Sequence, residues 1–375
     1  MESVRKSHPS LKARPMTLET NRTDLSSTRF VADAHEELAP GQCRLHVEHF
    51  ALTTNNITYG VFGDMLRYWD VFPTSDSGWG RIPTWGFAKV VESTSDELPI
   101  GERLFGFLPM SSETIITPGK VDERGVSDVA AHRVGLAGAY NRYQRCSTDP
   151  VYDAHREPQQ MVLYPLFFTS FVIDDFLLDN EDFAATQAVV SSASSKTAIG
   201  FAQLAKKRGL KTVGLTSEGN REFVESLNVY SEVVTYDAVD SIAKSPAVYV
   251  DIAGNQDLLR AVHTHLDGVL NHSMVVGNTN WNHKATDTRA LPAPTPEFLF
   301  APSQIAKRTK EWGRDELDQR IGSAWKNYSE WCDTWLEFSQ AVGNEDVLGV
   351  YETLRSGQPD PKLGYICSLP SEEAK

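Results

Sequence analysis

Residues 189–213 read Val-Val-Ser-Ser-Ala-Ser-Ser-Lys-Thr-Ala-Ile-Gly-Phe-Ala-Gln-Leu-Ala-Lys-Lys-Arg-Gly-Leu-Lys-Thr-Val, the most informative stretch of the chain. A short apolar segment ends at Val190, a turn of small residues follows, and residues 198–205 carry apolar side chains at helical spacing. Gly209 ends that helix, and a second apolar segment begins at Lys211. This order predicts a strand, turn, helix and parallel strand. Because backbone N–H groups at a helix N-terminus bind phosphate, the stretch favours a dinucleotide ligand.

The turn departs from the usual dinucleotide fingerprint, which has three glycines. Ser194, Ser195, Lys196 and Thr197 stand there instead. Hydroxyl and ammonium groups can donate hydrogen bonds to phosphate oxygens, so these residues suit a phosphate site rebuilt with side chains. The alternative is a turn that no longer binds a nucleotide.

The composition restricts the class of protein. A chain of 375 residues predicts two domains, and its formal net charge of −14 argues against nucleic acid as a partner. Four widely spaced cysteines indicate free thiols in a reducing cytoplasm. We expect no apolar run long enough to span a bilayer and no secretory signal. We expect a small-molecule substrate and no membrane partner. A homodimer is possible.

Two patterns of segments divide the chain. Near the N-terminus, some segments alternate apolar and polar residues and others are mainly apolar. Gly and Pro separate these segments, which predicts a compact barrel. Its expected strands are residues 42–50, 84–91 and 104–108. After Phe167, strands and helices alternate, which predicts a parallel sheet with helices on both faces. The expected strands are 212–215, 232–236, 247–252 and 273–277, with helices at 167–178, 220–227 and 256–266 and a longest helix at 321–342.

Several segments also match one family in order. They are residues 40–42, 50–57, 82–91, 100–106, 203–206, 250–254 and 275–277. Together they resemble the medium-chain dehydrogenase/reductase superfamily, in its zinc-free, quinone-reductase-like branch. Residues 138–143, 164–171 and 191–198 are most similar to a subfamily of unassigned function. The resemblance implies an α/β fold with a GroES-like β-barrel domain, residues 1–165 and 341–375, and a Rossmann-type doubly wound parallel-sheet domain, residues 166–340. It also implies an active site in the cleft between the two.

The second strand of the nucleotide-binding domain indicates the cofactor. An acidic residue at its end would hold a ribose hydroxyl, but Thr216 and Ser217 stand there, and Arg221 can reach a 2′-phosphate. NADP(H) is therefore expected, although Glu218 could take the acidic role. The full set of expected cofactor contacts is Ser194, Ser195, Lys196, Thr197, Thr216, Ser217, Arg221, Ala253 and Gly277.

No metal site is expected, because the segment around Gly86 lacks the His and Glu of zinc-dependent members and the cysteines are scattered. Hydride transfer still needs a group that polarises a carbonyl or donates a proton. The candidates are Asn56, Tyr59, Tyr140 and Thr169. The expected function is a zinc-independent, NADP(H)-dependent oxidoreductase acting on a small carbonyl, enone or quinone. A non-redox enzyme or a non-catalytic binding protein on the same fold is the alternative.

Overall fold

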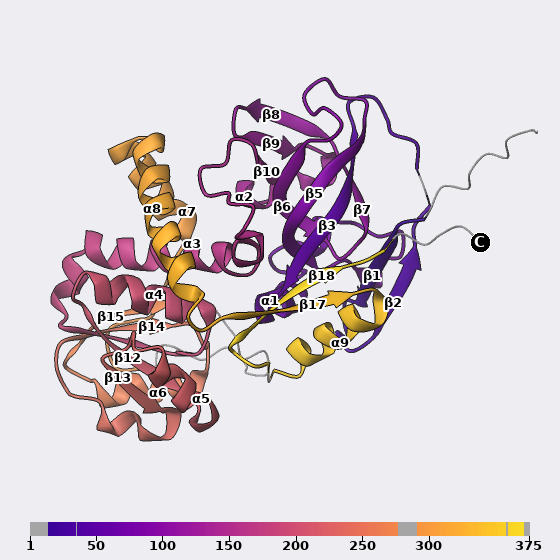
Figure 1. Ribbon diagram of the computed structural model, residues 1–375. Coiled ribbons are helices and arrows are strands. Elements are labelled where there is room, and N and C mark those ends of the chain that lie inside the picture. The colour runs from indigo at the N-terminus through magenta and orange to yellow at the C-terminus, as the bar shows by residue number, and fades with distance from the viewer. Residues whose placement is uncertain (1–13, 35, 277–290, 358, 371–375) are drawn as a thin grey trace, which may run out of the picture. The chain divides into compact units, whose positions relative to one another are not determined.

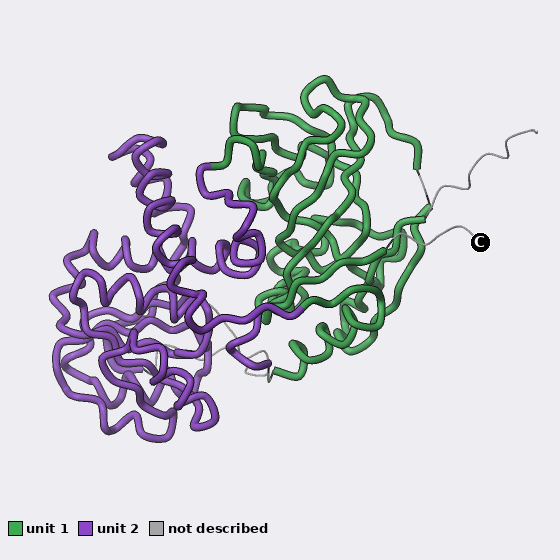
Figure 2. The backbone as a smooth tube through the Cα atoms, viewed as in Figure 1, with its two compact units in different colours: residues 1–149, 340–358, 365–375 green, residues 150–339, 359–364 purple. Residues whose placement is uncertain are grey.

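The computed structural model describes residues 14–34, 36–276, 291–357 and 359–370. The chain forms two compact units, coloured separately in Figure 2. Unit 1 comprises Met1–Asp149, Gln340–Gln358 and Tyr365–Lys375, and unit 2 comprises Pro150–Ser339 and Pro359–Gly364. The sequence prediction placed residues 150–165 with the barrel domain. They lie in unit 2, and those from Glu157 onward form the start of helix α3, Glu157–Asp179, which continues into that unit.

Unit 1 is built on two sheets in which most neighbouring strands are antiparallel. The large sheet has the strand order β17-β18-β3-β5-β6-β10-β9-β8, and β7 pairs with β3. Its strands are β17 (Glu337–Val342), β18 (Leu363–Ser368), β3 (Cys43–Leu52), β5 (Pro83–Ser93), β6 (Arg103–Pro109), β10 (Arg142–Arg145), β9 (Gly125–Asp128), β8 (Pro118–Asp122) and β7 (Glu113–Ile116). A smaller sheet has the order β2-β1-β4, formed by Thr28–Ala32, Met16–Asn21 and Trp79–Gly80.

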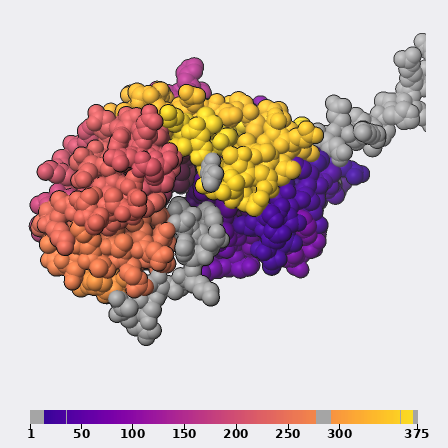
Figure 3. Space-filling view, turned by 90° about the horizontal axis from the view of Figure 1, so that it is seen from below, coloured from indigo at the N-terminus to yellow at the C-terminus, as the bar shows by residue number. Residues whose placement is uncertain are grey.

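The helices of unit 1 are short. They are α1 (Thr54–Val61), α2 (Gly138–Asn141) and α9 (Asn344–Arg355). Figure 3 shows residues near the C-terminus (yellow) against N-terminal residues (indigo), and the Tyr351 hydroxyl of α9 donates a hydrogen bond to the Leu25 carbonyl. The chain therefore returns to complete unit 1 late in the sequence.

Unit 2 contains a parallel sheet with helices on both faces (Figure 1). The strand order is β13-β12-β11-β14-β15-β16, and every pair in it is parallel. These strands are Glu232–Thr235, Lys211–Thr216, Gln187–Val190, Ala247–Asp251, Leu270–Val275 and Glu297–Phe298. The helices are α3, α4 (Lys196–Lys207), α5 (Glu218–Ser226), α6 (Gln256–His265), α7 (Ala301–Trp312) and α8 (Arg314–Cys332).

Two hydrophobic clusters show why the sheet is covered on both sides. Val190 packs with Phe201 of α4 and Ile173 of α3, whereas Val189 packs with Leu259 of α6. Successive strand residues face opposite sides of a sheet, so a strand that is apolar at both positions requires helices on both faces. The predicted fold class, a sheet-rich domain and a Rossmann-type parallel-sheet domain, is confirmed.

The predicted helix over residues 321–342 is wrong in its second half. Helix α8 ends at Cys332, and residues Glu337–Val342 form strand β17. Trp325, Tyr328 and Cys332 do form the buried face of α8. Apolar residues spaced for a helix can continue by chance into a strand, and the pairing of β17 with β18, a contact between distant residues, fixes the strand.

The prediction that no segment is long and apolar enough to span a bilayer is also wrong. Helix α3 has 23 residues and contains an 18-residue window with a mean hydropathy of 1.7. Half of that window is buried inside the protein. Asp175 on this helix pairs with Arg308 of α7 at 2.8 Å. A core helix packed between neighbours has the same composition as a membrane span, so length and hydropathy do not separate the two.

Candidate functional site

The carboxyl edge of the parallel sheet in unit 2 is held by Ser191 and Asp251. Ser191 follows β11, and its Oγ donates a 2.8 Å hydrogen bond to Asp251 Oδ1 at the end of β14. The same Oγ accepts hydrogen bonds from the N–H groups of Ile252 and Ala253, each at 2.9 Å. Burial raises the pKa of the Asp251 carboxyl, while the Ser191 hydrogen bond opposes that rise. This network fixes the ends of two neighbouring strands, the place where doubly wound sheets bind ligands.

The turn after β11 leads directly into the N-terminus of α4. Ser195 is the N-cap residue, and its Oγ accepts a hydrogen bond from the Ala198 N–H at 3.3 Å. The N–H groups of Lys196 and Thr197 precede any intrahelical partner, so they face outward from the helix end. Ser194 Oγ accepts a hydrogen bond from the Asn220 amide at 3.1 Å. The residues predicted for the phosphate site therefore lie together at one helix N-terminus.

The side chain of Lys196 has a different environment from its backbone. Its Nζ donates hydrogen bonds to the carbonyls of Leu363 at 3.0 Å and Pro361 at 3.4 Å. Burial lowers the pKa of this ammonium from 10.5 to about 8. The Tyr328 hydroxyl donates to the Lys196 carbonyl at 3.4 Å. The ammonium is therefore already bonded to protein oxygens, while the Lys196 N–H remains at the helix end.

The predicted residues at the end of β12 are close to one another but differ in exposure. Thr216 is fully buried, and its hydroxyl has no hydrogen-bond partner among the described residues. Ser217 is the N-cap of α5. Arg221, on the same helix, is 47% exposed and pairs with Glu225 at 2.9 Å and with Glu218 at 4.0 Å. Gly277, the last predicted cofactor residue, lies outside the described residues.

A cluster of aromatic rings in unit 1 contains two of the predicted catalytic residues. Tyr59 of α1 lies 4.5 Å from Tyr68 and 5.4 Å from Phe107, between ring centroids. Tyr140 of α2 stacks on Phe107 at 4.7 Å, and Trp85 of β5 contacts Phe107 at 4.9 Å. Tyr59 and Tyr68 are buried, whereas Tyr140 and Trp85 are half-buried. The fold thus brings Tyr140 together with Tyr59 and Tyr68, which lie much earlier in the sequence.

The hydroxyl groups of this cluster are hydrogen-bonded in pairs. The Asn55 amide donates to the Tyr59 hydroxyl at 2.7 Å, and the Tyr68 and Tyr140 hydroxyls are 2.9 Å apart. Burial is the main cause that raises the pKa of each of the three tyrosines. All three therefore remain protonated donors at neutral pH. Tyr68 was not among the residues singled out from the sequence, because nothing local distinguishes it from a core tyrosine.

Two further predicted catalytic residues have structural contacts. Asn56 Oδ1 accepts from the Thr53 N–H at 2.7 Å, and its amide donates to the Pro83 carbonyl at 2.8 Å. These bonds cap α1 and join it to β5. The Thr169 hydroxyl on α3 lies 3.5 Å from the Pro165 carbonyl, one helical turn earlier. A catalytic role for either side chain stays a prediction.

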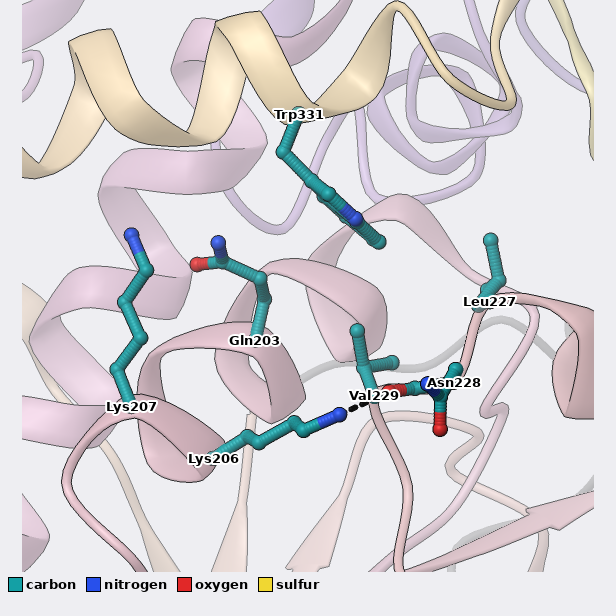
Figure 4. Close-up of a pocket in the computed structure, with 7 residues that line it drawn as sticks. All are labelled: Gln203, Lys206, Lys207, Leu227, Asn228, Val229 and Trp331. Carbon is teal, nitrogen blue, oxygen red and sulfur yellow. Dashed lines mark hydrogen bonds between the residues drawn. The ribbon is translucent and has the colours of Figure 1, made fainter.

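A separate pocket of about 350 Å³ lies between α4, the end of α8 and residues 227–229 (Figure 4). It is lined by Gln203, Lys206, Lys207, Leu227, Asn228, Val229 and Trp331. Lys206 donates a hydrogen bond to the Asn228 carbonyl, so one of the two ammonium groups is engaged. Burial lowers the pKa of Lys207. None of the predicted site residues lines this pocket.

Across the part of the chain that the structure describes, no three His, Cys, Asp or Glu side chains are grouped so as to hold a metal ion. Cys43, Cys146, Cys332 and Cys367 are all free, and burial raises the pKa of Cys367 to about 12. A thiol with a raised pKa is a poor metal ligand, because metals bind the thiolate.

Residues 50–360 match the family model described as "Protein of unknown function (DUF2855)". The chain belongs to this family. No curated protein matches the sequence.

Many solved structures share the fold at low sequence identity. CurA from Vibrio vulnificus, solved in complex with NADPH, has a TM-score of 0.60 and 10% identity, over 95% of this chain and 99% of that one. A putative NADPH:quinone reductase from Mesorhizobium loti has a TM-score of 0.60 and 11% identity, covering 96% and 99%. The CurK enoyl reductase has a TM-score of 0.57 and 11% identity, covering 95% and 100%. The chain therefore has the fold of enoyl and quinone reductases.

Proposed function

We propose that this protein is an NADP(H)-dependent oxidoreductase whose nucleotide binds at the carboxyl edge of the parallel sheet in unit 2. One observation carries the proposal: the outward N–H groups of Lys196 and Thr197 stand at the N-terminus of α4, directly after the central strand β11. A helix N-terminus in this position favours a pyrophosphate through its N–H groups and its dipole. Ser194 and Ser195 add hydroxyl groups at the same end.

Other residues at this edge fit the same ligand. The buried Thr216 hydroxyl lacks a partner, and a ribose or phosphate oxygen would satisfy it. The Ala253 N–H already donates to Ser191, so a contact of Ala253 with the nucleotide would use its other atoms. Arg221 is exposed on the first turn of α5, where it can meet a 2′-phosphate. Because no acidic residue ends β12, we propose a preference for NADP(H) over NAD(H).

The names of the structural relatives support this choice. CurA was solved with NADPH, and the Mesorhizobium loti protein is described as a putative NADPH:quinone reductase. The CurK structure is that of an enoyl reductase. We therefore propose a small carbonyl, enone or quinone as substrate, and a reaction that uses no zinc. The free cysteines support a reducing compartment such as the cytoplasm.

The tyrosines of unit 1 are the groups that we propose for substrate activation and proton donation. A bound NADPH would supply the hydride, so the protein must polarise the acceptor and provide a proton. The hydroxyls of Tyr59 and Tyr140 are protonated and lie in a largely buried aromatic cluster, where a hydrogen bond to developing negative charge is strong. We propose that they carry out both tasks.

Calorimetric titration of the full chain with NADPH and with NADH tests the nucleotide site. We expect NADPH to bind, and Ser194→Glu to abolish binding because a carboxylate would then face the phosphates. Ser226→Glu, at the exposed end of α5, is the matched control and should bind like the parent.

Absence of binding to either nucleotide would refute the proposal and favour a non-redox enzyme or a binding protein. If NADPH binds, its oxidation in the presence of a quinone or enone, followed by absorbance, tests the reaction. Binding without turnover of any such acceptor would contradict the oxidoreductase assignment.

A further inference from the structure

We infer that the hydroxyls of Tyr59 and Tyr140 form a two-donor site for one carbonyl oxygen of a planar conjugated ketone, enone or quinone. In this site Asn55 and Tyr68 are positioning residues that direct the two protons outward. The inference rests on the proposed function for its substrate class. Its test is a binding experiment without nucleotide, so this inference and the proposed function can fail independently of each other.

The Tyr59 hydroxyl already accepts a hydrogen bond, so its own proton is left to be donated. Asn55 is the donor of that bond, at 2.7 Å. The Tyr59 proton meets no acceptor among the described residues, yet the side chain is only 6% exposed. A buried donor without an acceptor is costly, so this proton is available for a ligand oxygen.

Tyr68 directs the second proton. It is 7% exposed, and the Tyr140 hydroxyl at 2.9 Å is its hydrogen-bond partner. A hydroxyl this deeply buried must use its proton within the pair, so Tyr68 donates and Tyr140 accepts. The proton of Tyr140, whose side chain is half-buried, then points away from Tyr68 and is left for a ligand.

The surroundings select a planar and uncharged ligand. The stacked rings of Tyr140 and Phe107, with Trp85 beside them, provide an apolar surface on which a conjugated system can lie. The guanidinium of Arg133, which donates to the Tyr140 carbonyl, is paired with Asp128 at 2.9 Å, so its charge is compensated. Neutral donors suit a carbonyl oxygen, whereas a carboxylate would lose its hydration without gaining a counter-charge.

Equilibrium dialysis with two ligands of matched shape measures this recognition. 2-Acetylnaphthalene carries the carbonyl oxygen, and 2-ethylnaphthalene lacks it. The ratio of the two dissociation constants measures the preference for the ketone. A change in this ratio between the parent and a variant reports the contribution of the contact to the carbonyl oxygen. We expect Tyr59→Phe and Tyr140→Phe to lower the preference for the ketone by about 2- to 10-fold each, the range for one net hydrogen bond. Tyr351→Phe, which removes a hydroxyl elsewhere in unit 1, should leave the ratio unchanged.

Infrared spectroscopy of the bound ketone tests the two positioning residues. With a ¹³C-labelled carbonyl, the stretch should lie at lower frequency in the parent protein than in Tyr68→Phe or Asn55→Ala, because a misdirected donor polarises the carbonyl less. A purely structural role would not move this frequency in protein that still binds. If Tyr68→Phe does not fold, the carbonyl frequency in Asn55→Ala alone tests the positioning role.

The inference is overturned if the parent protein binds neither ligand, or if its preference for the ketone survives Tyr59→Phe combined with Tyr140→Phe. An identical carbonyl frequency in the parent and the positioning variants would overturn the roles of Asn55 and Tyr68. Failure to bind NADPH would refute the proposed function and leave these results standing.

Discussion

The Nζ atom of Lys196 lies 3.0 Å from the carbonyl oxygen of Leu363, which joins the first residue of α4 to a segment 167 residues later in the chain. The bond holds residues Pro359–Gly364 within unit 2. The ammonium therefore acts as a tether in this structure, and the backbone N–H of Lys196 is the group left for a phosphate.

Replacement of Lys196 by Met separates these two roles. The variant keeps the N–H but loses the tether, so we expect the free energy of unfolding to fall by about 1.5–3 kcal/mol, the range for hydrogen bonds to a charged group. The dissociation constant for NADPH should change little. Urea denaturation and calorimetry on the same protein check both values. A tenfold loss of NADPH affinity would instead show that the ammonium leaves the carbonyls and binds phosphate.

The same residue predicts a dependence of stability on pH. Burial lowers the pKa of Lys196 from 10.5 to about 8, so between these values the unfolded chain binds a proton that the folded chain does not. Stability then rises with pH across that window, because the unfolded state binds more protons. We expect the parent protein to gain stability relative to Lys196→Met as the pH increases from 8 toward 10.5. Parallel pH profiles of the two proteins would contradict the lowered pKa.

Arg221 and Glu225 give a paired test of cofactor preference. Arg221→Ala should narrow the difference in affinity between NADPH and NADH, because it removes the cation proposed for the 2′-phosphate. Glu225→Gln should widen it, since the carboxylate 2.9 Å away competes for the guanidinium. Both effects should be severalfold and should shrink at high salt, as the pair is exposed. An unchanged NADPH to NADH ratio in both variants would rule out a role for Arg221.

Two helical glycines provide a matched test of packing around the proposed site. A Cβ at Gly200 of α4 would lie 2.6 Å from Ser170 Oγ, whereas at Gly219 of α5 it would meet nothing within 4 Å. We expect Gly200→Ala to destabilise the protein by about 1–3 kcal/mol through overpacking. Gly219→Ala should stabilise it by up to about 1 kcal/mol through helix propensity. Thermal or urea unfolding measures both, and equal effects would contradict the close packing of α3 against α4.

Periodicity and turn residues were sufficient for the fold class. The apolar run at Val189 and Val190, the small turn and Gly209 predict a strand, a helix and a parallel strand, and the structure has all three. These signals are local: a strand buried on both faces must be apolar at successive positions, and a helix must repeat its apolar residues every three or four. Such rules do not fix where an element ends, which is why β17 was mistaken for helix.

Contacts between distant residues could not be predicted in this way. The Lys196 ammonium looks like a phosphate ligand in the sequence, but its partners lie far along the chain, at Pro361 and Leu363. Tyr68 and Tyr140 are 72 residues apart, and only the folded chain brings their rings and hydroxyls together. A hydrogen bond depends on distances of a few tenths of an ångström. Those distances are set by the packing of whole helices and strands. The residues next to Tyr68 or Tyr140 in the sequence do not indicate this packing.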